Sequence, residues 1–103
     1  MKKKSKKTLN RIRLKEWAVI VKTHADFKCE ICGKPASDAH HVISRHILKT
    51  RYDVLNGVAL CKFHHKFAKV EASAHGCPLL FYEWMRTHKI GQYQYLLQAL
   101  KIK

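Results

Sequence analysis

The feature that most constrains this chain is a group of cysteines and histidines crowded into the middle of only 103 residues. Cys29 and Cys32 form a C-x-x-C pair, Cys61 lies further along, and Cys77 is the fourth cysteine. A chain of this length buries a small core, so metals or disulfides commonly supply part of the stability. Because the lysine-rich start lacks the apolar segment of a secretory signal, the cysteines are predicted to bind metal rather than to form disulfides.

Charge narrows the class of partner. The sequence has 21 Lys and Arg against 7 Asp and Glu, a formal net charge of +14 at pH 7. Self-repulsion of this size is best tolerated beside a polyanion, which predicts a nucleic-acid partner. Ribosomal or packaging roles, and a basic protein without a nucleic-acid role, share this signature. The apolar stretches are too short to span a bilayer, so we expect a cytoplasmic protein.

The chain is expected to form one domain over residues 14–103, preceded by a basic, flexible arm over residues 1–13. Apolar residues recur at i, i+3, i+4 and i+7 over residues 14–25, which predicts an amphipathic helix. Similar stripes predict two further core helices, over residues 79–88 and 93–100.

Between these helices the pattern is that of a hairpin followed by another helix. Residues 39–43 and 58–60 have the β-branched and apolar character of short strands. A helix is expected over about residues 62–72, and a metal-binding turn over residues 27–35, where Gly33 supplies backbone freedom. Together these elements predict an α+β fold.

The most specific signal is an ordered set of motifs: C-x-x-C at Cys29, then A-H-H-V around His41, then N-G-V-A-L-C-x-x-H-H from Asn56 to His65. Over residues 29–72 this set resembles the HNH nuclease family. The resemblance implies a ββα-metal (His-Me finger) core with a structural zinc knuckle, flanked by an N-terminal helix and C-terminal helices. It also implies a reaction, which is metal-dependent hydrolysis of DNA.

The family's roles transfer to four residues of this sequence. His41 matches the general base, and histidine suits that task because its ordinary pKa lies near neutrality. His40 and His65 match the ligands of the catalytic ion, which is Mg²⁺, Mn²⁺ or Ni²⁺. Asn56 matches the asparagine whose amide ties the loop to the strand that bears the base. An Asn-Gly pair before a strand is also an ordinary turn signature.

A second metal, a structural Zn²⁺, is expected on Cys29, Cys32 and Cys61, which are soft ligands suited to a tetrahedral ion. Where many HNH proteins have a second C-x-x-C, this chain has His64 three residues after Cys61. His64 is the favoured fourth ligand because its spacing repeats that of the knuckle. Cys77 is the rival, and its other interpretation is a small buried apolar residue.

Four further residues are candidates around the catalytic ion. His75 could be a third ligand or a phosphate contact, because Lys69 stands where some family members have an additional histidine. Asp38 could orient one of the paired histidines, or be an exposed turn residue. Arg45 and Arg51 are predicted to contact the nucleic-acid backbone, although they would also suit a solvated surface.

The sequence therefore predicts an HNH endonuclease that nicks or cleaves DNA, with His41 activating water and a divalent ion stabilising the departing 3′ oxygen. Cleavage of both strands in concert would require a homodimer. A zinc-containing nucleic-acid-binding module without catalysis is the alternative, and it leaves the paired histidines unexplained. A metal-trafficking or redox protein ranks last because it gives the charge no role.

Overall fold

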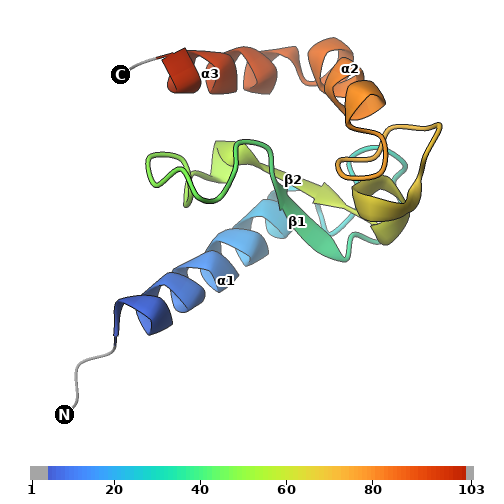
Figure 1. Cartoon of the computed structure of the whole chain (residues 1–103). Coiled ribbons are helices and arrows are strands. Elements are labelled where there is room, and N and C mark those ends of the chain that lie inside the picture. Colours follow the sequence, from blue (N-terminus) through green and yellow to red (C-terminus); the bar gives the residue numbers. More distant parts are fainter. Residues whose placement is uncertain (1–4, 102–103) are drawn as a thin grey trace.

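The computed structural model describes residues 5–101 and shows a small α+β globule, in which helices flank a two-stranded antiparallel hairpin (Figure 1). Its elements are α1 (Lys6–His24), β1 (Asp38–His41), the 3₁₀ turn η1 (Val54–Asn56), β2 (Gly57–Leu60), the π-helical turn η2 (Phe63–Phe67), α2 (Pro78–His88) and α3 (Ile90–Lys101). Within the described residues, no helix combines the length and apolar character that crossing a lipid bilayer requires.

Helix α1 begins at Lys6, well before the expected start at Leu14. Ser5 caps it, because the Ser5 hydroxyl accepts a hydrogen bond from the Thr8 backbone N–H at 3.1 Å. The intrinsic helix propensity of lysine and arginine is compatible with this early start, and Ser5 is a favourable N-cap residue. Part of the expected basic arm is thus helical, and residues 1–4 of that arm lie outside the described residues.

Strand β2 is buried along its whole length because α1 covers one face of the hairpin and α2 and α3 cover the other. Val58 and Leu60 pack with Phe81 and the rest of the larger cluster, which includes residues of α2 and α3. Ala59, on the opposite face, packs with Trp17 of α1. The C-terminal helices expected from the apolar stripes are confirmed. They cover the face of β2 that carries Val58 and Leu60, which α1 does not cover.

The hairpin register places Asp38 opposite Leu60 and His41 opposite Gly57. A Cβ at Gly57 would lie 2.3 Å from Val21 Cγ2 and 2.9 Å from the Trp17 ring. Gly57 therefore permits α1 to pack directly against the start of β2, beside the paired histidines.

Only the first part of the helix expected over residues 62–72 forms, and the rest of that prediction is wrong. The chain makes one π-helical turn, η2, and then Ala68 adopts an extended conformation. The following segment returns along η2, since the N–H of Ala74 donates to the His64 carbonyl and that of His75 to the His65 carbonyl. Gly76 makes this possible, because a Cβ there would lie 2.1 Å from the Ala68 carbonyl oxygen.

Candidate metal centres

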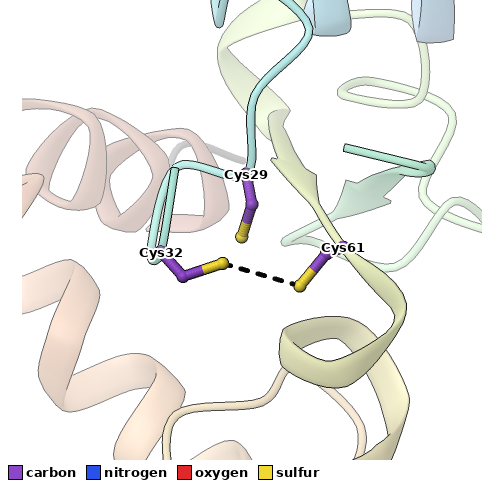
Figure 2. Close-up of side chains that lie close together, drawn as sticks. All are labelled: Cys29, Cys32 and Cys61. Atoms are coloured by element: carbon purple, nitrogen blue, oxygen red, sulfur yellow. Dashed lines mark hydrogen bonds between the residues drawn. The ribbon is translucent and has the colours of Figure 1, made fainter. Parts of the chain in front are cut away.

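The first centre consists of three thiols, from Cys29, Cys32 and Cys61 (Figure 2). Their sulfur atoms all lie within 4.8 Å of one another, and those of Cys32 and Cys61 are 3.8 Å apart. Tetrahedral zinc with Zn–S bonds of about 2.3 Å separates two sulfurs by about 3.8 Å. The donor set and its spacing therefore fit a metal ion such as Zn²⁺.

Local backbone structure holds the thiols together. The turn closes as the Gly33 N–H donates to the Cys29 carbonyl, and Gly33 takes the left-handed conformation with φ +78°. Glu30 joins this turn to β2, since its backbone N–H donates to the Ala59 carbonyl and its carboxylate accepts from the Ala59 N–H. Cys61 follows β2 directly, so the turn and the hairpin end at one point.

The Cys29 sulfur lies where its thiolate is favoured. Burial by itself raises the pKa of the Cys29 thiol, but backbone N–H groups of Cys61, Cys32 and Ile31 hydrogen-bond to the sulfur and lower the pKa below its ordinary value. Thiolates are the form that binds a metal, so this environment suits ligation.

Neither predicted fourth ligand joins the three thiols, which form a group of their own within residues 5–101. His64 is buried, and its Nδ1 lies 2.7 Å from the Ala72 carbonyl oxygen. A carbonyl only accepts hydrogen bonds, so Nδ1 carries a hydrogen and Nε2 is the nitrogen left for a ligand. Cys77 precedes α2 and is half-buried.

The second centre consists of three histidines from three different segments. His40 lies on β1, His65 on η2, and His75 on the segment that returns along η2. One ring nitrogen of each lies within 4.8 Å of the others, and the His65 and His75 ring centroids are 4.8 Å apart. The structure thus brings His75 to the predicted pair of ligands.

Asp38, the first residue of β1, orients the His65 ring of this centre. Its Oδ2 lies 2.7 Å from His65 Nδ1, and its Oδ1 accepts from Lys62 Nζ at 2.9 Å. Burial raises the pKa of Asp38, but these hydrogen bonds and charges outweigh it and hold the pKa below its usual value. The ionised carboxylate fixes the hydrogen on Nδ1 of His65, which leaves Nε2 free to bind a cation.

The environment of His40 keeps its imidazole neutral. Burial, reinforced by the neighbouring rings of His65, His75 and His41, lowers the pKa of His40 to about 3. A neutral imidazole is the form that donates a lone pair to a metal. His40 therefore offers a nitrogen ligand that need not lose a proton first.

His41 points to the opposite face of β1, toward α1. Its ring stacks on Trp17 with the centroids 3.7 Å apart and the planes inclined by 10°. Its Nε2 lies 2.9 Å from the Arg51 carbonyl oxygen, so Nε2 carries the hydrogen and Nδ1 is the free acceptor. Burial, together with the charges of Arg45 and Arg51, lowers the pKa of His41 despite that hydrogen bond.

Asn56 is fully buried and joins three parts of the site. Its Oδ1 accepts from the Ile43 N–H at 2.6 Å, and its Nδ2 donates to the carbonyls of Ile43 and Thr50 at 3.0 and 3.2 Å. Ile43 follows β1, and Thr50 precedes the residue whose carbonyl accepts from His41. The amide thereby fixes both segments that hold the His41 ring.

An open pocket of about 610 Å³ connects the two faces at the end of β1. Its lining includes His40, His41, His65, His75, Arg45 and His46. A smaller pocket beside it shares Arg45 and His46 and is completed by Asn10, Leu14 and Arg51. Arg45 therefore borders the histidines directly, whereas Arg51 faces α1, where it donates to the Asn10 side chain at 3.2 Å.

Trp17 belongs to the apolar pattern over residues 14–25, which identifies it only as a core residue. Trp17 is indeed 3% exposed, yet it is also the stacking partner of His41, and its Nε1 donates to the Asp53 carbonyl at 2.7 Å. No sequence pattern identifies such a contact, since it depends on how α1 crosses the hairpin.

Comparison with protein-family models, with curated proteins and with solved structures finds no match for this chain.

Proposed function

We propose that this protein is an HNH-type endonuclease that hydrolyses DNA phosphodiester bonds with a divalent ion. The observation that carries the proposal is the convergence of His40, His65 and His75 beside His41 in one open pocket. A purely structural zinc domain has no need of this second group. The motif order from Cys29 to His65 supports the same assignment and relates the hairpin with η2 to a ββα-metal core.

In this proposal His41 is the general base. Its Nε2 is engaged by the Arg51 carbonyl, so Nδ1 is the atom that takes a proton from the attacking water. The Trp17 stack and the Asn56 hydrogen bonds hold the ring so that this nitrogen keeps one direction. Arg45, at the edge of the same pocket, would contact the phosphate through its planar guanidinium.

His40, His65 and His75 would hold the ion, with Asp38 fixing the orientation of His65. When bound, a divalent ion such as Mg²⁺, Mn²⁺ or Ni²⁺ supplies charge stabilisation to the phosphate and to the departing 3′ oxygen. The products would carry a 5′-phosphate and a 3′-hydroxyl.

Cys29, Cys32 and Cys61 would hold a separate, structural Zn²⁺. His64 is the preferred fourth ligand, because donation from its Nδ1 to a backbone carbonyl is the arrangement that metal-binding imidazoles usually adopt. Such an ion would fasten the N-terminal turn to the end of β2, where the small core gains most from a cross-link.

The test is nicking of supercoiled plasmid by zinc-loaded protein, with Mg²⁺, Mn²⁺ or Ni²⁺ added in turn. We expect metal-dependent nicking that falls about 10²- to 10⁴-fold in His41→Ala, the range for loss of a general base. His24→Ala, which removes an exposed histidine of α1, is the matched control and should cut normally. Equal cutting by both variants would exclude His41 as the base.

A zinc-containing nucleic-acid-binding module is the alternative, and metal stoichiometry separates it from the nuclease. The nuclease predicts one tightly held Zn²⁺ and a second, exchangeable ion that His40→Ala weakens. The module predicts zinc alone and DNA binding without nicking under every metal.

A further inference from the structure

We propose that one exposed face of α1, formed by Lys7, Arg11 and Lys15, docks the sugar-phosphate backbone of a DNA duplex whose neighbouring phosphate lies in the histidine pocket. The proposal rests on the proposed function for the position of the cut, but binding along α1 is tested separately from cutting. These three residues are called the α1 stripe below.

The stripe is a single surface. Its residues recur every fourth position, so they lie on one face of α1 with a rise of about 6 Å between neighbours. All three side chains are exposed, and none forms an ion pair within residues 5–101. Three cations in a row on a rigid helix match the repeated charges of a nucleic-acid backbone better than they match an isolated anion.

The positive charges of the stripe lower the stability of the helix that carries it. The first turn of α1 contains no acidic residue, and Lys6 and Lys7 stand where the helix dipole disfavours positive charge. Neighbouring cations at i and i+4 also repel each other by a few tenths of a kcal/mol. Charge that costs helix stability is explained if a polyanion neutralises it in the bound state.

The stripe borders the histidine pocket. Leu14 lies one helical turn from Arg11 and lines the small pocket that also contains Arg45 and His46. Arg45 and His46 in turn line the larger pocket with the three histidines. A polyanion could therefore run from the stripe, past the Leu14 side chain, across Arg45 to His41.

The shape of the molecule favours a duplex. The N-terminal half of α1 extends away from the hairpin in Figure 1, which leaves its outer side open to a large partner. On the flank facing the loop after β1, Arg13 stacks over Tyr52 at 3.8 Å and Asn10 bonds the Tyr52 hydroxyl. These contacts hold α1 against the loop after β1, so the stripe has a fixed position relative to the histidine pocket.

The experiment compares two triple variants in a His41→Ala background, which prevents cutting. One replaces the stripe by Lys7→Gln, Arg11→Gln and Lys15→Gln. The control removes the same charge elsewhere by Lys34→Gln, Lys69→Gln and Lys101→Gln. Affinity for a duplex oligonucleotide is measured by fluorescence anisotropy as a function of salt, and circular dichroism checks the helix content.

We expect the stripe variant to bind about tenfold or more weakly, with the logarithmic salt slope reduced by about 0.9 for each lost phosphate contact. The control should keep most of its slope. Equal losses in both variants would mean that only net charge matters and would overturn the proposal. A loss confined to single-stranded RNA, with duplex binding unchanged, would overturn it as well. If wild-type protein binds through the stripe but never nicks, the proposed nuclease function fails while the docking surface stands.

Discussion

Three histidines in or beside the two centres, His41, His64 and His65, each have one ring nitrogen already engaged. His41 Nε2 faces the Arg51 carbonyl, His64 Nδ1 the Ala72 carbonyl, and His65 Nδ1 the Asp38 carboxylate. Each partner accepts a hydrogen bond, so each ring is held as one tautomer with its other nitrogen free. A ring that donates from one nitrogen to a fixed acceptor presents its other nitrogen in one direction, ready for ligation or proton transfer before any substrate arrives.

Asp38→Asn tests this preparation. The amide can no longer act as an anionic acceptor for His65 Nδ1, so we expect affinity for the exchangeable ion to fall 10- to 100-fold. Isothermal titration with Mn²⁺ or Ni²⁺ measures the change. Asp26→Asn is the control, since the Asp26 side chain is exposed and, among residues 5–101, its one ion pair is with Lys28 at 3.9 Å. Unchanged affinity in Asp38→Asn would show that Asp38 does not orient a ligand.

The variant Asn56→Ala tests how much the buried Asn56 amide contributes to the stability of the fold. The substitution leaves the backbone groups of Ile43 and Thr50 without their partners in a region closed to water. We expect a loss of about 2–4 kcal/mol in the free energy of unfolding. Urea denaturation of zinc-loaded protein measures it, and a loss below about 0.5 kcal/mol would mean that water replaces the amide.

At the level of elements, the centre of histidines depends on the interruption of a helix. Had η2 continued as an α-helix, the backbone N–H groups of Ala74 and His75 would not reach the carbonyls of His64 and His65. The extended conformation at Ala68 turns the chain back, and the ring of His75 then lies beside that of His65.

Gly76→Ala should separate His75 from the other two histidines. A Cβ at this position would lie 2.1 Å from the Ala68 carbonyl oxygen and 2.7 Å from that of Lys66, so backbone must move. We expect destabilisation by at least about 1–3 kcal/mol, as for other overpacked sites, and weaker binding of the exchangeable ion. Thermal unfolding and metal titration measure the two effects.

Gly91→Ala is the matched control for that experiment. Its Cβ would meet no atom within 4 Å, and alanine favours the start of α3 by up to about 1 kcal/mol. The control should therefore be neutral or slightly stabilised with unchanged metal binding. If Gly76→Ala behaves in the same way, the close approach of the return segment is not required.

At the scale of the whole molecule, the three thiols bring together the turn after α1 and the end of β2. The turn that carries Cys29 and Cys32 follows α1, and Cys61 links β2 to η2, so a metal there would fix α1, the hairpin and η2 together. This matters because the two apolar clusters on either side of the hairpin are both small.

Removing the zinc should therefore loosen the entire domain. We expect Cys61→Ser to lose zinc, measured by mass spectrometry under native conditions, and to unfold at markedly lower temperature. His64→Ala should retain zinc more weakly than wild type, whereas Cys77→Ser should retain it normally. The reverse order for the last two variants would make Cys77 the fourth ligand.

The sequence alone was sufficient to predict the α+β class, the flanking helices, the hairpin and a possible metal site on Cys29, Cys32 and Cys61. These features follow from local rules, because ligand spacing and apolar periodicity act over neighbouring residues. The same rules misplaced the start of α1 and predicted a helix over residues 62–72. They took no account of the Ser5 cap, or of the return of the chain over Gly76.

Only the tertiary structure decided which side chains meet. The stack of Trp17 on His41 joins α1 to β1, and the approach of His75 to His40 joins the segment before α2 to the hairpin. Contacts of this kind depend on the packing of whole elements against a common core, which no local pattern in the chain encodes. Their physical origin is the burial of β2 between two helical layers, which brings residues distant in sequence to the end of one short strand.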